Sequence, residues 1–207
     1  MARLTVPVWL DVKSPYAYLA VHPTRDLERD YDVALDWRFY TLDIPLFLGN
    51  VDGRNDHQWR RVKYSYMDAR RIANTRGLTV LGPRKVFDSR PVHAAMLFAQ
   101  TGGARASVFR AFMDATFELF WKRQLDIEDV GALVRQLGEA GAGDAERFPA
   151  WLVGEGLALH DRLKDEAHDL GVFGVPSYIV DGELYWGGDR LGQVRGHLDR
   201  LGLARKP

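Results

Sequence analysis

The strand-like segments of this sequence lie at its two ends, and the segment between them, Asp56–Trp151, shows helical periods without a convincing pair of strands. At the amino-terminal end, the apolar run Leu4–Leu10, a helix that begins after Ser14 and the alternating run Val33–Tyr40 predict strand, helix, strand. At the other end, a helix precedes SYIVDGELYW (177–186), in which an Asp-Gly turn predicts a hairpin. A sheet in this chain therefore has to be assembled from both ends, with a helical block inserted between them.

Three prolines set limits on the first strand and the first helix. Pro7 argues against a long central strand, so we expect strand pairing to begin only after it. Ser14 followed by Pro15 is typical of a helix start, with the serine as N-cap and the proline in the first turn. Pro23 lies inside this helix and predicts a kink or an early break.

The middle of the chain predicts a series of helices. One of them carries apolar residues at spacings of three and four, which favours packing in a core over the lining of a pocket. Asp126 stands where it can cap the next helix. A helix that ends at Gly171 and a last helix over Asp189–Leu201 complete the pattern. The other expected helices are Gln58–Asn74, Pro91–Gln100 and Ser107–Trp121, and the stripe on the last of these is Phe109, Phe112, Met113, Phe117 and Phe120.

Composition argues against several classes of protein. Lys plus Arg and Asp plus Glu each number 28, a balance that is unusual for a general nucleic-acid-binding protein. The chain has no cysteine, which excludes disulfides, thiolate metal sites and thiol chemistry by its own side chains. The six histidines have no metal-ligating spacing, so we expect no metal site. Without an apolar run of membrane-spanning length or a cleavable leader, we expect a soluble cytoplasmic protein that does not bind membranes.

Two motifs carry a resemblance to a known family. SPYAYLA, which begins at Ser14, and GVFGVPSYIVDGELYWGGDRL, which begins at Gly171, closely resemble motifs of the 2-hydroxychromene-2-carboxylate isomerases and the kappa-class glutathione transferases. Both groups are similar to the disulfide oxidoreductase DsbA. The resemblance implies an α/β protein with a thioredoxin-like fold and an inserted all-helical domain. It places the thioredoxin-like domain in residues 1–45 and 154–207, and the helical domain in residues 46–153.

The same resemblance implies a thiol that is not part of the chain. Redox members of this group open the first helix with a Cys-x-x-Cys pair, where this chain has Ser14-Pro15-Tyr16-Ala17. The thiol is then expected from glutathione as a cofactor, with the hydroxyl of Ser14 donating a hydrogen bond to its sulfur. The alternative for Ser14 is a plain helix N-cap, which an isolated Ser-Pro pair would favour.

The energies involved agree with this role for Ser14. A free thiol has a pKa near 8.5, so about 3% is thiolate at pH 7, and lowering that pKa by about two units takes about 2.7 kcal/mol. A hydrogen bond to a charged group contributes about 1.5–3 kcal/mol, and a helix N-terminus adds about 0.3–1 kcal/mol. The hydroxyl and the helix end together are sufficient, so the serine need not act as a nucleophile.

Further contacts to glutathione are implied residue by residue. Val175-Pro176 matches a loop in which the proline is cis and the backbone of Val175 is free to pair with an extended peptide. A trans-proline at the start of a strand is the alternative. Asp189 matches an aspartate that holds the γ-glutamyl amino group, and capping of the last helix is its other possible role. Gly187 and Gly188, just before it, allow close backbone approach.

The resemblance also extends, with departures, to the middle of the chain. Asn50 matches an amide that contacts glutathione, but the following VDGRNDHQW lacks the prolines that are usual there. Lys63 matches a lysine that meets a glutathione carboxylate, and an exposed helix charge is its alternative. Lys13, beside Ser14, either lowers the thiol pKa further or points to solvent.

The remaining candidate residues carry weaker signals. His160 and His168 share one helix and are expected at the surface. The lack of a GxSxG motif argues against Ser14 as the nucleophile of a hydrolase. Aromatic residues that could line an apolar acceptor site, although core packing is the commoner role, are Tyr16, Tyr18, Trp121 and Trp186.

The function implied by the resemblance is glutathione-dependent cis–trans isomerisation of an unsaturated aromatic keto acid. A thiolate would add to the conjugated system, the resulting single bond would rotate, and the thiolate would leave. The alternatives are a kappa-like glutathione transferase, which releases the adduct, and a non-catalytic thiol-binding or chaperone-like module. The expected partners are glutathione, a small aromatic substrate and a second copy of the chain in a homodimer.

Overall fold

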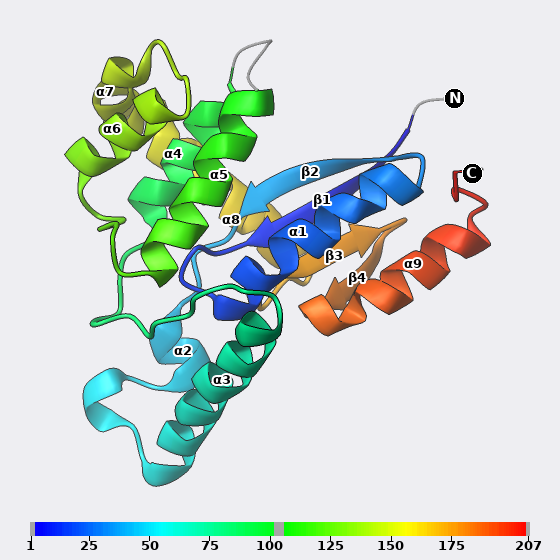
Figure 1. The fold of residues 1–207 in the computed structure, drawn as a ribbon, viewed down its shortest axis with the longest axis horizontal. Coiled ribbons are helices and arrows are strands. Elements are labelled where there is room, and N and C mark those ends of the chain that lie inside the picture. The colour runs from blue at the N-terminus through cyan, green and yellow to red at the C-terminus, as the bar shows by residue number, and fades with distance from the viewer. Residues whose placement is uncertain (1–2, 102–105, 206–207) are drawn as a thin grey trace.

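A mixed sheet lies at the centre of the computed structural model, which describes residues 3–101 and 106–205. Within these residues the sheet has four strands in the order β2-β1-β3-β4 (Figure 1). β1 and β2 are parallel, whereas β3 pairs antiparallel with both β1 and β4. Two strands therefore come from each end of the chain, as the sequence predicts. The strands are β1 (Leu4–Leu10), β2 (Val33–Phe39), β3 (Ser177–Val180) and β4 (Glu183–Trp186).

The position of Pro7 corrects one expectation. β1 pairs with β2 along its whole length, from Leu4 opposite Val33 to Leu10 opposite Phe39, so pairing on this side does not begin only after the proline. On the other side the expectation is confirmed, because β1 pairs with β3 only at Val8 and Trp9. A proline removes a single donor from the ladder and leaves the donors of its neighbours in place.

Helices cover both faces of this sheet. Figure 1 shows α1 (Pro15–Asp30) in front of the sheet, beside α9 (Leu191–Arg200), and α8 (Leu157–Asp169) behind it. α1 continues without a break past Pro23, so an early end of the helix at that proline is wrong. The strand and helix order is that of the expected thioredoxin-like fold.

The segment between β2 and α8 forms the expected helical block. Its apolar stripe on α5 is buried, which confirms core packing for these side chains. The cap of α6 is Asp129, whose carboxylate accepts from the amide of Ala132, and not Asp126, whose carboxylate accepts from Glu128 instead. The helices here are α2 (Ile44–Leu48), α3 (Asp56–Thr75), α4 (Arg90–Gln100), α5 (Ala106–Trp121), α6 (Val130–Glu139) and α7 (Phe148–Trp151).

The carboxyl-terminal elements agree closely with the sequence pattern. α8 is followed by Gly171, whose positive φ of 77° favours glycine at the end of a helix. Asp181 and Gly182 both have positive φ, as a tight turn between β3 and β4 requires. α9 begins at Leu191, after a single 3-10 turn over Gly188–Arg190, so Asp189 lies in this turn and not in the helix. The boundaries of the two domains, residues 1–45 with 154–207 and residues 46–153, stay a prediction.

Candidate active site

Ser14 caps the amino terminus of α1. The amide of Ala17 donates to its Oγ at 3.2 Å, and Pro15 occupies the first turn, so the sequence signal for a helix start is confirmed. The side chain is buried. Its hydroxyl proton points away from the helix and donates to the carbonyl oxygen of Val175 at 3.4 Å, across 161 residues of sequence. Capping therefore uses only the acceptor side of this hydroxyl and leaves its donor facing the loop opposite.

That opposing loop contains a cis peptide bond between Val175 and Pro176, as the resemblance implies. The loop is held from behind, because the buried hydroxyl of Ser177 donates to the carbonyl of Gly174 at 2.7 Å. The Val175 carbonyl and the Ser14 hydroxyl are consequently fixed on facing elements that come from opposite ends of the chain. A distance of 3.4 Å is long for an O–H···O hydrogen bond, so this proton is only weakly engaged.

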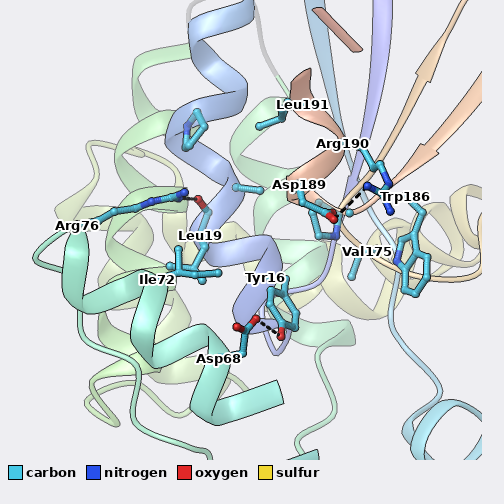
Figure 2. A pocket seen from close by; sticks show the side chains of 15 residues that line it. Tyr16, Leu19, Asp68, Ile72, Arg76, Val175, Trp186, Asp189, Arg190 and Leu191 are labelled. Carbon is cyan, nitrogen blue, oxygen red and sulfur yellow. Dashed lines mark hydrogen bonds and ion pairs between the residues drawn. The ribbon is translucent and has the colours of Figure 1, made fainter. Parts of the chain in front are cut away.

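A cavity of about 510 Å³ opens beside this pair, a size usual for small-molecule sites. One wall is formed by α1 and α3, and the other by the Val175-Pro176 loop and the segment Trp186–Leu191 (Figure 2). Among the predicted site residues, the structure brings Val175, Pro176 and Asp189 to this cavity, while Ser14 is not among its lining residues and is joined to the wall by its contact with the Val175 carbonyl. Most of the lining is apolar, with a few polar groups at defined places.

Asp189 stands on the cavity wall with an exposed carboxylate. Its side chain is 71% exposed and lies 3.3 Å from the guanidinium of Arg190 (Figure 2). Gly188 allows close packing here, because a Cβ at this position would lie 3.3 Å from the Cβ of Ala20 on α1. Gly187 has a φ of 112°, a conformation that favours glycine. The glycine pair thus fits the close approach that the sequence indicates.

Asn50 and Lys63 lie apart from this cavity. Asn50 is exposed and precedes the 3-10 turn Val51–Gly53, and Lys63 is exposed on α3. Neither is among the residues that line the cavity. Their contacts with glutathione stay a prediction.

Tyr16 and Asp68 form a polar pair on the cavity wall that the sequence does not reveal. The Tyr16 hydroxyl donates to Asp68 Oδ2 at 2.9 Å, joining α1 to α3 (Figure 2). Burial and this hydrogen bond raise the pKa of Tyr16 above its usual range, so the phenol stays protonated. The sequence names Tyr16 as a lining candidate, but nothing local pairs it with a residue 52 positions later.

The other aromatic candidates divide between the cavity and the core. Trp186 lines the cavity and lies against Phe173, with ring centroids 4.7 Å apart. Tyr18 and Trp121 are buried and packed against one another, with ring centroids 6.4 Å apart. Tyr16 and Trp186 are therefore the members of the set that line the cavity.

Behind the turn that leads to Ser14, the carboxylate of Asp11 is fully buried. It accepts from the amides of Lys13 at 3.0 Å and Leu42 at 2.8 Å, and lies 3.7 Å from the ammonium of Lys13. Burial alone would raise the pKa of Asp11, but the charges of His93 and Lys13 and the Leu42 amide outweigh it and lower the pKa to about 2. Lys13 therefore points inward, with its side chain 8% exposed, and not to solvent.

The buried polar cluster continues from Asp11 into the helical block. His93 on α4 lies 3.2 Å from Asp11, and its Nδ1 is 2.9 Å from the hydroxyl of Thr41. The same hydroxyl is 3.0 Å from His160 on α8. The expectation that His160 lies at the surface is wrong: its side chain is 1% exposed, because α4 and the residues after β2 cover it. Burial and the charge of His93 lower the pKa of His160 to about 4.

His168, in contrast, is exposed on α8, as expected from the sequence. Its ring contacts the hydroxyl of Tyr40 at 3.1 Å. None of the helices in residues 3–101 and 106–205 has the length and apolar character needed to cross a membrane.

Comparisons of the sequence and of the structure with known proteins identify the family of this chain. A family model for the DSBA-like thioredoxin domain matches residues 5–199. The chain belongs to this family. Among proteins of the DSBA-like group, a 2-hydroxychromene-2-carboxylate isomerase from Pseudomonas putida is 27% identical, with 96% of each chain covered. A protein of the same name from Sphingobium xenophagum is 28% identical, with 94% of this chain and 97% of that protein covered.

Solved structures agree with this DSBA-like assignment at the level of the fold. The structure of a 2-hydroxychromene-2-carboxylate isomerase superposes with a TM-score of 0.74 at 24% identity, covering 96% of each chain. The cytosolic disulfide reductase DsbM from Pseudomonas aeruginosa, solved with glutathione, gives a TM-score of 0.61 at 21% identity, with 96% and 98% covered. The thioredoxin-like fold with its inserted helical domain is thereby confirmed.

Proposed function

We propose that this protein is a glutathione-dependent cis–trans isomerase of an unsaturated aromatic keto acid. The observation that carries the proposal is the hydroxyl of Ser14, which caps α1 and donates across to the Val175 carbonyl beside the cavity. Relatives named 2-hydroxychromene-2-carboxylate isomerase, which match almost the whole chain, support the choice of reaction.

The residues of the cavity fit glutathione. The cavity, at about 510 Å³, has room for a small peptide, and it would offer the exposed carboxylate of Asp189 to an ammonium group and the cis Val175-Pro176 loop to an extended backbone. A protein of the same fold, the reductase DsbM, has been solved with glutathione, which supports this choice of thiol. In the absence of cysteine, the chain itself offers no thiol in its place.

Bound glutathione would supply a thiolate that adds to the conjugated double bond, lets the resulting single bond rotate and leaves unchanged. Ser14 would stabilise the negative charge on the sulfur. Its proton is held by the Val175 carbonyl at 3.4 Å only, so a charged acceptor competes for it readily. The amino terminus of α1 adds a favourable dipole at the same place.

Other residues orient the ligand and shape the site. Asp189 would bind the γ-glutamyl ammonium, with Val175 pairing with the peptide backbone and Asn50 and Lys63 reaching the remaining polar groups. Tyr16 stays protonated and donates to Asp68, which fixes its ring on the cavity wall. The apolar character of the wall favours an aromatic acceptor and strengthens the electrostatic contacts within the site.

A homodimer and a cytoplasmic location belong to the same proposal. Apolar side chains on α2 and α3 that are exposed in the single chain, including Leu46 and Trp59, are surface that a second subunit would cover. Light scattering of the purified protein measures the oligomeric state directly.

An activity assay tests the proposed function. The assay follows isomerisation of 2-hydroxychromene-2-carboxylate by ultraviolet absorbance. We expect activity when glutathione is present and no activity when it is omitted. The Ser14→Ala protein should be at least about tenfold slower, the loss expected when one hydrogen bond to a charged group is removed. A stable glutathione adduct in place of the isomer, detected by mass spectrometry, would indicate a transferase. Neither product with a folded protein would indicate a non-catalytic module.

A further inference from the structure

The proline in the middle of α1 leaves one backbone carbonyl of the helix without its usual hydrogen-bond donor. A side chain from another helix donates to this carbonyl instead. In a helix, the carbonyl of Leu19 accepts from the amide four residues later, but that residue is Pro23, which has no N–H. Arg76, at the carboxyl-terminal end of α3, donates from Nη1 to this carbonyl at 2.6 Å. Although Arg76 is an exposed residue, this hydrogen bond directs its guanidinium to α1 at the edge of the cavity (Figure 2).

This guanidinium carries a positive charge that no side chain nearby offsets. Within the part of the chain that the structure describes, no ion pair joins Arg76 to a carboxylate. The carboxylates that line the cavity are engaged elsewhere, Asp68 by the Tyr16 hydroxyl and Asp189 by Arg190. Asp68 also lies eight residues earlier on α3, about 12 Å along the helix axis.

The surroundings of this charge are apolar. Arg76 lines the cavity together with Leu19, Pro23 and Ile72, and Leu191 forms the wall opposite. A guanidinium presents five N–H donors in a fixed fork that matches a carboxylate, and only one of them is used on the Leu19 carbonyl. A pre-positioned, uncompensated guanidinium beside apolar walls is suited to an organic anion with an apolar body.

We propose that Arg76 forms a carboxylate-binding subsite at the Pro23 end of the cavity. This proposal rests on the proposed function, since the subsite would hold a carboxylate of one of the two ligands of that reaction. The carboxylate belongs either to the aromatic acid or to the thiol peptide, which share this chemistry. Pro23 has a part in the subsite, because its missing N–H is what draws Arg76 into place.

Binding measurements with simple probes test this subsite without any catalytic turnover. Calorimetry would compare trans-cinnamate with its uncharged amide, cinnamamide, on the wild type, Arg76→Met, Arg76→Lys and Arg71→Met. Arg71 is an exposed arginine on the same helix and outside the cavity lining, so its replacement controls for the change in net charge. Thermal unfolding of each variant confirms that it is folded.

The subsite predicts a selective loss. Arg76→Met should weaken the binding of at least one of two anionic probes, cinnamate and S-methylglutathione, about tenfold, as expected for one charge-assisted hydrogen bond, while Arg71→Met and the cinnamamide affinities stay unchanged. Arg76→Lys should recover part of the loss. S-methylglutathione, which has no free thiol, forms a second arm of the experiment: a loss with this probe alone assigns the subsite to the thiol peptide, and a loss with cinnamate alone assigns it to the aromatic acid.

The proposal is overturned if neither anion loses affinity in Arg76→Met, or if cinnamamide loses as much as cinnamate. Failure of the proposed function would be seen in the activity assay and not in these binding measurements. A folded protein that forms no isomer with glutathione contradicts the function, whereas cinnamate and S-methylglutathione, which carry no free thiol, test the subsite alone. Ser14→Ala should leave the binding of both probes unchanged, because it acts only on the ionisation of the glutathione thiol.

Discussion

The two sides of the turn Asp11–Ser14 use their polar groups in opposite ways. On the cavity side, Ser14 makes a long contact to Val175, and Asp189 is largely exposed. On the interior side, Asp11 is fully buried and every group around it is bonded within the protein. The difference separates two roles: the Asp189 carboxylate on the cavity side is exposed to a ligand, whereas the Asp11 carboxylate on the interior side is bonded to the protein and closed to solvent.

The two sides also connect different parts of the chain. The cavity side joins the two ends of the sequence, through α1 and the Val175-Pro176 loop. The interior side joins the end of β1 to the helical block, through His93 on α4 and His160 on α8. Substitutions on the interior side should therefore cost stability, whereas those on the cavity side should cost binding and chemistry.

The largest expected effect is the loss of stability in Asp11→Ala. Removing this carboxylate leaves Lys13 and His93 buried without their partner, which should lower the free energy of unfolding by about 3–5 kcal/mol. Urea unfolding measures the change. Asp26→Ala is the matched control, because Asp26 pairs with Arg29 at the exposed surface of α1 and its loss should leave the unfolding midpoint unchanged. Equal midpoint shifts in both variants would contradict the contrast between the two sides.

A second effect is a dependence of stability on pH that comes from the interior side. Because the pKa of His160 is lowered to about 4, the unfolded chain binds a proton between about pH 6.5 and 4 that the folded chain does not. Stability should fall by about 3 kcal/mol as the pH drops through this range. Asp11, with its pKa lowered to about 2, stabilises the fold above about pH 4, and that contribution is lost as the pH falls toward 2.

Urea unfolding at a series of pH values checks this dependence. His160→Gln should remove the slope between about pH 6.5 and 4, while His22→Gln, at an exposed position of α1, should retain it. A slope that survives in His160→Gln would assign the pH dependence to other groups.

Ser14→Ala should have a much smaller effect on folding. It removes the cap of α1, which is worth about 1 kcal/mol. Asp129→Ala removes the equivalent cap of α6 and should cost a similar amount in urea unfolding. If Ser14→Ala were as destabilising as Asp11→Ala, Ser14 would belong with the interior groups and its availability to a ligand would be lost.

The smallest effects are expected within the cavity side itself, in the binding of glutathione. Asp189→Asn should weaken binding up to about fivefold, since the carboxylate is exposed and screened. Lys63→Met should have a smaller effect, because Lys63 lies outside the cavity lining. Calorimetry ranks the two, and a larger loss for Lys63 would show that glutathione extends along α3 beyond the cavity.

The sequence predicted the elements whose signals are local. The hairpin turn Asp181-Gly182, the cap at Ser14 and the glycine that ends α8 each depend on residues that are neighbours in the chain. The prediction of Asp126 as a cap was wrong, because Asp129 precedes the same apolar run and the helix begins only after it.

Features that depend on contacts between residues far apart in the chain could not be predicted from the sequence. His160 is covered by His93 on α4 and by Thr41, both far from it in the sequence, and its own helix also carries the exposed His168, so helical periodicity gave no sign of the difference. Pro23 was expected to disturb α1, but its effect on Leu19 is offset by Arg76, 57 residues from that carbonyl. The facing of Ser14 and Val175 came from the resemblance and not from any local pattern.

The most direct test of the account is the ionisation of the glutathione thiol in the presence of the protein. Titration of its ultraviolet thiolate absorbance should give a pKa about two units below that of the free thiol for the wild type and for Asp129→Ala, and a value close to the free thiol for Ser14→Ala. A bound thiol with the same pKa in the wild type and Ser14→Ala would contradict the role of the Ser14 hydroxyl. The absence of any bound thiolate in the wild type would contradict the glutathione site itself.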